Sequence, residues 1–267
     1  MNRVDDYRLV ARVARAAGLE HPSRFQRLDH GKSGDIVLRL EGRQTYFAKI
    51  GDPERRISNA ELVRESRALE WLAGRAGAAR LVWSGQVDAW PALVTKAIPG
   101  VALHELAPEQ AEAGAIAAIA ALSVLHSLPI TDCRFDERLA VKMGEAARRV
   151  AAGEIDISNF DDRNVDRSAA DVWRRLAARQ LPDEDLVVTH GDACWPNLIL
   201  RPGGLVGLID LGRAGVADRH QDLGLFIRSA EHNFPGIPVR ALIAAHYRLA
   251  PLDERKVAFY QELDEFF

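Results

Sequence analysis

Short apolar runs bounded by turn signals occupy the first third of the chain, whereas longer stretches with helical spacing fill most of the rest. Residues 36–40 and 45–50 are β-type runs joined by a turn at 41–44, and 81–83 and 92–95 read as two further strands. The pattern therefore predicts a small antiparallel sheet in the N-terminal part of the chain.

Elsewhere, apolar positions recur every three or four residues, which is typical of helices packed on a core. Ser58 and Glu61 have the spacing of a capping box, so a helix is expected to begin there. Helices are further predicted at residues 6–18, 111–128 and 137–152. The fold class that follows is α+β, with a small antiparallel sheet and one packed helix in the N-terminal part and a mostly helical C-terminal part.

The composition fits a folded globular chain and argues against several classes of protein. Of 267 residues, 48% are hydrophobic and the net charge is −3, so no general basic surface invites nucleic acid. Cys133 and Cys194 lie far apart without metal-binding spacing, which favours a reduced protein. The N-terminal residues lack the apolar run of a signal peptide, and the apolar stretch 115–125 is too short to span a bilayer. We therefore expect a cytoplasmic protein.

Candidate chemistry is concentrated in one loop, residues 190–197, with the sequence His-Gly-Asp-Ala-Cys-Trp-Pro-Asn. The β-type run 186–189 ends at this loop, and a following hairpin would carry Asn197 at its entry and Asp210 at its exit. The side chains of Asn197 and Asp210 carry oxygens of the kind that bind Mg²⁺. Asp192 could take the proton of an attacking hydroxyl. Taken singly, Asp192 and Asn197 could be turn formers, but the combination favours a catalytic and metal site.

The predicted N-terminal hairpin carries a second set of candidates. Ser33 lies in a Gly-Lys-Ser-Gly loop whose amides and hydroxyl could donate to phosphate oxygens, although an ordinary flexible turn fits equally well. Phe47 and Lys49 share one face of the strand 45–50. Lys49 could reach the α- and β-phosphates of a nucleotide and Phe47 could lie against adenine, whereas a solvated lysine is the alternative.

Glu65 occupies the apolar stripe of the helix that follows, together with Leu62, Leu69 and Leu72. A carboxylate among leucines is costly unless a cation meets it, and Lys49 is the expected partner. Glu61 is a rival whose capping role already explains it.

The order of the candidate residues resembles that of the functional residues in the eukaryotic-kinase fold. These candidates are Lys49, Glu65, Asp192, Asn197 and Asp210. The motifs His-Gly-Asp and Ile-Asp-Leu-Gly-Arg are similar to those of the aminoglycoside phosphotransferase family. This resemblance implies a protein-kinase-like two-lobed fold, with a nucleotide-binding lobe at residues 1–97 and a catalytic and substrate-binding lobe at 98–267. It also implies ATP and Mg²⁺ as cofactors, and main-chain hydrogen bonds from Lys96 and Ile98 to adenine.

Acidic residues gather in the segment 154–171 and at the C-terminus, which ends Leu-Asp-Glu-Phe-Phe. A solvated loop face is the default interpretation, and a surface that attracts a polycation is the alternative. In aminoglycoside 3'-phosphotransferases the corresponding segments hold ammonium groups of the drug. The resemblance therefore implies substrate contacts at Asp161, Asp162, Arg213, Glu231, Asp264, Glu265 and Phe267.

The activity expected from this resemblance is ATP-dependent phosphorylation of an aminoglycoside hydroxyl, which confers antibiotic resistance. The C-terminal tail favours the 3'-hydroxyl, whereas the segments 33–35 and 98–101 look like those of streptomycin 3''-kinases. A choline or sugar kinase of the same fold, a nucleotide-binding scaffold without catalysis, and a metal-dependent hydrolase using Asp192 and Asp210 are rival functions. We expect a monomer that takes a small-molecule substrate and binds neither nucleic acid nor a membrane.

Overall fold

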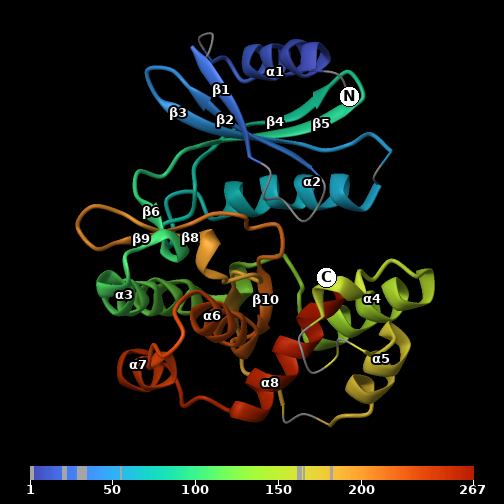
Figure 1. Ribbon diagram of the computed structural model, residues 1–267, viewed down its shortest axis with the longest axis vertical. Helices are drawn as coiled ribbons and strands as arrows, with labels where there is room; N and C mark the ends of the chain where they lie inside the picture. Colours follow the sequence, from blue (N-terminus) through green and yellow to red (C-terminus); the bar gives the residue numbers. More distant parts are fainter. Residues whose placement is uncertain are drawn as a thin grey trace. The chain divides into compact units, whose positions relative to one another are not determined.

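The structure is a computed structural model that describes residues 3–19, 23–28, 35–54, 56–160, 164, 166–180 and 183–267. Ser33, Asp161 and Asp162 lie outside these residues. The chain divides into two compact units (Figure 1). The first comprises Met1–Gly100 and Gly207–Arg213, and the second comprises Val101–Val206 and Ala214–Phe267.

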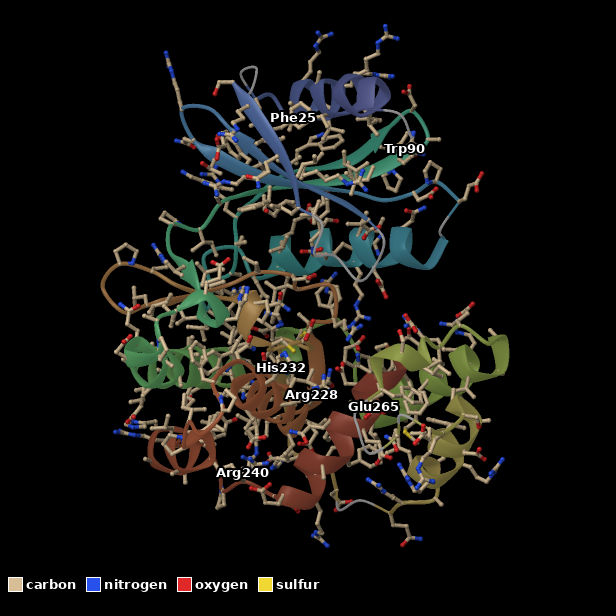
Figure 2. The ribbon with its side chains drawn as sticks, viewed as in Figure 1. Phe25, Trp90, Arg228, His232, Arg240 and Glu265 are labelled. Carbon is tan, nitrogen blue, oxygen red and sulfur yellow. The ribbon has the colours of Figure 1, made fainter. Side chains whose placement is uncertain are left out.

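The first unit is built on a five-stranded antiparallel sheet of order β1-β2-β3-β5-β4. Its strands are β1 Arg24–Leu28, β2 Ile36–Glu41, β3 Thr45–Ile50, β4 Leu81–Val87 and β5 Trp90–Lys96. Four of the five match the predicted strands. The edge strand β1 was missed because its sequence, Arg-Phe-Gln-Arg-Leu, lacks a regular apolar alternation; Phe25 nevertheless packs against the core of this unit (Figure 2).

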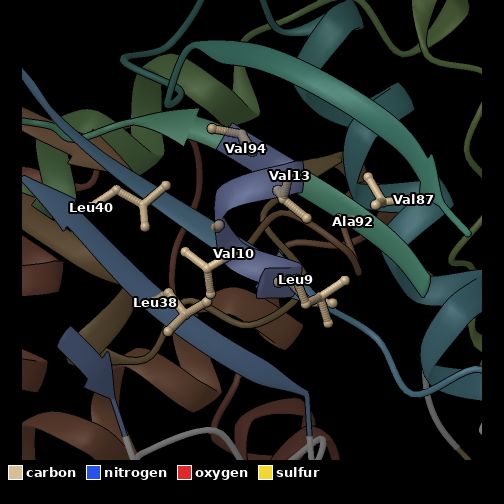
Figure 3. Close-up of a cluster of buried hydrophobic side chains, with 10 residues drawn as sticks. Leu9, Val10, Val13, Leu38, Leu40, Val87, Ala92 and Val94 are labelled. Atoms are coloured by element: carbon tan, nitrogen blue, oxygen red, sulfur yellow. The ribbon is translucent and has the colours of Figure 1, made fainter. Parts of the chain in front are cut away.

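Helix α1, Arg3–Ala16, covers one face of this sheet (Figures 1 and 3). Leu9, Val10 and Val13 of α1 pack against buried side chains of the strands, among them Leu38 and Val94. Leu38 is registered with Ala48, and Ala48 with Val94, so these positions share a face.

The neighbouring positions on β3, Phe47 and Lys49, point to the opposite face because side chains alternate along a strand. Helix α2, Arg56–Trp71, lies on that face (Figure 1). It begins at Arg56, two residues before the start expected at Ser58. Helix α1, which was predicted at residues 6–18, belongs to this unit as well.

The short segment 207–213 is bound to the first unit by its backbone. Leu208 N donates to Gly77 O at 3.1 Å, and Ala79 N donates to Leu208 O at 2.9 Å. At Gly207 a Cβ would lie 2.6 Å from Ile98 Cδ1, so a larger residue would require the Ile98 side chain to shift. Asp210, which was expected on a strand, lies beyond β9 Val206–Leu208 in a left-handed conformation with φ 59°.

The second unit is mainly helical, in agreement with the predicted fold class. Its helices are α3 Pro108–His126, α4 Leu139–Ala152, α5 Ala169–Ala177, α6 His220–Asn233, α7 Val239–His246 and α8 Glu254–Leu263, with a final 3-10 turn at Asp264–Phe266. Strand β6 Val101–Ala102 pairs with β8 Leu198–Leu200, and β7 Leu186–Thr189 pairs with β10 Gly215–Asp218. Within the described part of the chain, no helix has the length and apolar content needed to cross a membrane.

Helices α6 and α8 of this unit pack closely. At Gly224 of α6 a Cβ would lie 3.2 Å from Val257 O of α8. Gln261 Nε2 of α8 donates to Gly224 O at 2.9 Å. The glycine lets the two backbones approach, and the amide satisfies a main-chain acceptor at the contact.

Asp218 is the most heavily bonded acid at the start of α6. It is 1% exposed and accepts from His220 N at 2.9 Å, His220 Nδ1 at 2.7 Å, Lys256 Nζ at 2.6 Å and Asp185 N at 3.1 Å. Burial opposes ionisation, but the bonds from His220 and Lys256 outweigh it and lower the pKa of Asp218 to about 2.

We predict that Asp218→Asn lowers the free energy of unfolding by about 2 kcal/mol near pH 7, because the amide cannot replace an ionised acceptor of four donors. Since the pKa of Asp218 is lower in the folded protein than its ordinary 3.8, this stabilisation is complete above pH 4 and is lost between about pH 4 and pH 2. Denaturant unfolding of both proteins across that range checks it. A difference that does not shrink on acidification would contradict the assignment.

Candidate active site

The predicted catalytic loop forms a tight turn at the end of β7. Gly191 takes φ 86°, and the amides of His190 and Gly191 both donate to the Asp222 carboxylate, at 2.6 and 2.8 Å. Gln221 Nε2 donates to Gly191 O at 3.0 Å. Two adjacent residues of α6 thus fix the backbone of the turn just before Asp192.

Asp222 is fully buried and has a third partner, His126 Nε2 of α3, at 2.9 Å. His126 Nδ1 in turn contacts Tyr247 Oη at 2.7 Å. Burial opposes ionisation of Asp222, but the bond and charge of His126, together with the loop amide of His190, keep the pKa of this carboxyl below its ordinary value. The sequence motif did not reveal this role, because acids near a helix N-terminus are explained by the helix dipole alone.

Asp192 and Asn197 are brought together within the turn. Asn197 Nδ2 donates to Asp192 O at 3.0 Å and to Asp192 Oδ2 at 3.1 Å, and Asp192 N donates to His190 Nδ1 at 3.3 Å. Because its amide nitrogen faces Asp192, Asn197 directs its amide oxygen away from that residue. This orientation suits a hard-cation ligand beside a half-buried carboxylate.

Trp195 anchors the middle of the loop in the core. Its ring is fully buried against Phe226 and Phe234, with centroid separations of 5.8 and 5.2 Å. Trp195 N donates to Ser229 Oγ of α6 at 2.9 Å. Helix α6 therefore holds both ends of the segment that carries Asp192.

In the first unit, Lys49 contacts its predicted partner Glu65 and also Asp210, which was predicted only as a metal ligand. Lys49 Nζ lies 2.8 Å from Glu65 Oε2 and 2.7 Å from Asp210 Oδ1. Glu65 is 4% exposed, with the buried Leu62, Leu69 and Leu72 on the same helix. The expected Lys49–Glu65 ion pair is present, and the left-handed backbone of Asp210 brings a second carboxylate to the same ammonium.

Each of these groups is shifted by burial and by its neighbours. Burial opposes the charge of Lys49, but Glu65 and Asp210 more than compensate and raise the pKa of the ammonium. Burial raises the pKa of Glu65, which Lys49 counteracts and Asp210 reinforces. The ammonium therefore stays charged while two carboxylates share it.

The main chain at the expected adenine-binding segment is partly committed to the sheet. Lys96 N donates to Arg80 O at 2.9 Å, and Ala97 N donates to Thr45 O at 3.0 Å. The predicted Lys96 contact is thereby restricted to its carbonyl oxygen. Ile98 packs its side chain on Gly207, and Phe47 is registered with Thr95 on the sheet face that also carries Lys49.

The acidic C-terminal tail is held by internal cations and amides. Asp264 forms an ion pair with Arg228 of α6, and Asn164 Nδ2 donates to Glu265 Oε2 at 2.9 Å. Glu262, the neighbouring acid, pairs with two arginines of the α5 region, Arg175 and Arg179.

The last residue, Phe267, is also held by cations. Its ring lies 4.6 Å from Lys142 Nζ and 5.0 Å from Arg149 Cζ, measured to the ring centroid.

Glu231, another predicted substrate residue, lies apart from this tail within the second unit. Glu231 forms an ion pair with Arg240 of α7, which also contacts Glu254 in the first turn of α8. Since α8 has 10 residues, Glu254 and Asp264 are separated by about 15 Å along its axis. Arg213 is half-buried and belongs to the first unit.

We predict that Lys49→Met lowers the free energy of unfolding by about 3 kcal/mol, because it leaves the buried Glu65 beside Asp210 without a cation. A second substitution, Glu65→Gln, should return part of that loss. Denaturant unfolding without ligand measures both variants, with Arg67→Met, an exposed position on the same helix, as control. Wild-type stability of Lys49→Met would show that the pair does not hold Glu65 in place.

Comparison with known proteins agrees with this geometry. The model of the phosphotransferase enzyme family known as APH matches residues 24–260. An aminoglycoside 3'-phosphotransferase of Streptomyces fradiae is 37% identical over 252 residues, covering 90% of this chain and 94% of the relative.

Solved structures give the same result. A crystal structure of an aminoglycoside-3'-phosphotransferase of type VIII superposes with a TM-score of 0.85 at 33% identity, covering 100% of both chains. The aminoglycoside phosphotransferase APH(3'')-Id from Streptomyces rimosus, in complex with ADP and streptomycin, gives 0.82 at 25% identity, covering 98% of both chains. The protein-kinase-like α+β fold is thus confirmed, and the chain belongs to the aminoglycoside phosphotransferase family.

Proposed function

We propose that this protein transfers the γ-phosphate of ATP to a hydroxyl group of an aminoglycoside, with the 3'-hydroxyl favoured, and so confers resistance to the drug. The observation that carries the proposal is the Asp192–Asn197 turn, whose backbone is fixed by a buried carboxylate while its own carboxylate stays half-exposed. A loose phosphoryl-transfer transition state needs little more than such positioning and charge neutralisation.

In the second unit, Asp192 orients the sugar hydroxyl and takes up its proton. The hydrogen bond from Asn197 Nδ2 to Asp192 Oδ2 limits the rotation of the Asp192 side chain, so the base keeps one direction. This placement converts a bimolecular encounter into attack within a bound complex.

In the first unit, Lys49 holds the α- and β-phosphates and Glu65 positions its ammonium. Phe47 lies against adenine, the main chain of Lys96 and Ile98 binds its edge, and Ser33 contributes a phosphate contact. We propose on this basis that residues 1–97 bind the nucleotide and residues 98–267 bind the substrate and carry the base.

The residues proposed for the metal fit Mg²⁺ chemically. Asn197 offers an amide oxygen and Asp210 a carboxylate, and Mg²⁺ commonly takes one or two protein oxygens together with phosphate and water. Bound there, Mg²⁺ would neutralise charge on the phosphate oxygens.

ATP is an intracellular metabolite, so we propose from the reaction that the enzyme acts in the cytoplasm.

The charge distribution along the chain supports a nucleotide site and a cation site in different parts of the protein. Residues 1–100 carry 17 Lys and Arg against 12 Asp and Glu, whereas residues 101–267 carry 18 against 26. A polyanionic nucleotide is favoured by the first distribution and a polycationic drug by the second. The substrate contacts proposed are Asp161, Asp162, Arg213, Glu231, Asp264, Glu265 and Phe267.

The 3' position is favoured over 3'' by the higher identity to the 3'-phosphotransferases and by the Asp-Glu-Phe-Phe ending. The streptomycin complex of a structural relative supports the second candidate, 3''-phosphorylation of streptomycin. A panel in a susceptible host separates the two. Protection against kanamycin and neomycin but not streptomycin supports 3', the reverse supports 3'', and no protection together with no drug-dependent ADP release rejects both.

We predict that Asp192→Ala lowers kcat for kanamycin by about a hundredfold or more, because the hydroxyl loses its proton acceptor. Affinity for ADP should stay within about threefold of wild type, since Asp192 makes no proposed nucleotide contact. Coupled ADP-release assays and calorimetric ADP titration measure the two effects. Asp132→Ala, an exposed acid in the same unit, serves as control. Turnover of Asp192→Ala within a few-fold of wild type would refute the role.

A further inference from the structure

Arg228 of α6 is a half-buried cation that the proposed reaction leaves unexplained. Its guanidinium is 32% exposed, forms an ion pair with Asp264 and donates through Nη1 to Gln261 O at 3.0 Å. These two bonds fix Nη1 and Nη2 of the guanidinium at the end of α8. Asp264, in turn, is only 19% exposed.

The surroundings of Arg228 include the catalytic turn as well as the tail. Burial opposes its charge, but Asp264, and next Cys194 and Asp192, outweigh burial and raise the pKa of Arg228. The same groups shift the pKa of the Cys194 thiol: burial, Asp192 and Asp264 raise it, and Arg228 lowers it. Arg228 thus interacts electrostatically with two acids of different proposed roles, Asp192 and Asp264.

Helix α6 gives this point a fixed geometry. Asp222 binds the two amides before Asp192, and Ser229 Oγ accepts from Trp195 N after it. Arg228, next to Ser229 on the helix, binds the tail. One rigid helix therefore carries the contacts to the catalytic turn and to the acid proposed to bind the drug.

We propose that Arg228 is a positioning residue that determines substrate specificity. It holds the Asp264 carboxylate at a set distance from Asp192. An ammonium group bound by Asp264 then places the hydroxyl of its sugar at Asp192, the proposed base. The inference rests on the proposed function and names the residue that couples its two acids. Arg228 touches neither the reacting hydroxyl nor the phosphate. Its effect passes through Asp264.

Without this guanidinium, Asp264 would lose its ion pair with α6. A flexible carboxylate still attracts a polycation, so binding falls less than turnover. Lysine keeps the charge but cannot reproduce two directed bonds to Asp264 and Gln261 O. Arg228→Lys is therefore expected to recover only part of the activity lost in Arg228→Gln.

The test uses steady-state kinetics with kanamycin A and its four derivatives that each lack one amino group. For kanamycin A, Arg228→Gln should lower kcat/KM at least about tenfold, mainly through kcat, while KM for ATP is unchanged. The double variant Arg228→Gln/Asp264→Asn should be no worse than Asp264→Asn alone, since both changes remove one interaction. Arg174→Gln, which removes an exposed arginine of α5, is the matched control and should behave as wild type.

The deamino series gives a readout that a merely structural role would not move. For the derivative that lacks the ammonium bound by Asp264, Arg228→Gln and wild type should agree within about twofold. An equal loss for all five substrates, an altered KM for ATP, or an additive double variant would overturn the inference. If Arg228→Gln does not fold, the same comparisons made with Arg228→Lys decide it. A wild-type enzyme inactive on every aminoglycoside would instead defeat the proposed function.

Discussion

The buried carboxylate of Asp222 is the constraint on which the catalytic turn depends. Its Oδ1 accepts from Gly191 N, and its Oδ2 accepts from His190 N and is also hydrogen-bonded to His126 Nε2. A buried carboxylate is costly unless it is fully satisfied, and here three donors satisfy it. Because the carboxylate that accepts these amides comes from α6 and is also bound by α3, the turn before Asp192 is set by the packing of the second unit and not by its own sequence alone.

A similar constraint acts on the nucleotide side. One ammonium, Lys49, satisfies the buried Glu65 and also the Asp210 carboxylate, which reaches it through a left-handed backbone. Two carboxylates and one ammonium thus form a compact charged cluster beside the sheet. Under the proposed function, this cluster would present a fixed cation to the phosphates, as preorganised electrostatic catalysis requires.

The fold class and much of the candidate chemistry could be predicted from the sequence because they depend on local signals. Alternation on β3 placed Phe47 and Lys49 on one face, and helical spacing placed Glu65 among leucines. The strand β1 escaped prediction since it is stabilised by pairing with β2 and not by its own pattern. The start of α2 at Arg56 shows that a capping-box spacing alone does not decide where a helix begins.

The contacts that hold the site could not be predicted, because they join residues far apart in the chain. Asp222 is 32 positions from His190, and Arg228 is 36 from Asp264. The sequence around Asp222 does not show whether this acid holds a loop in place or only interacts favourably with the helix dipole. The tail acids likewise read as exposed, whereas the fold gives Glu262, Asp264 and Glu265 partners of their own.

The central claim is that Asp192 directs one alcohol of an aminoglycoside at the terminal phosphate of ATP. Purification of kanamycin after incubation with the enzyme, ATP and magnesium, followed by phosphorus–proton correlation NMR, tests it most directly. The account predicts a single monophosphorylated drug whose phosphorus couples to the proton on the 3'-carbon. Release of inorganic phosphate with the drug unchanged would contradict it.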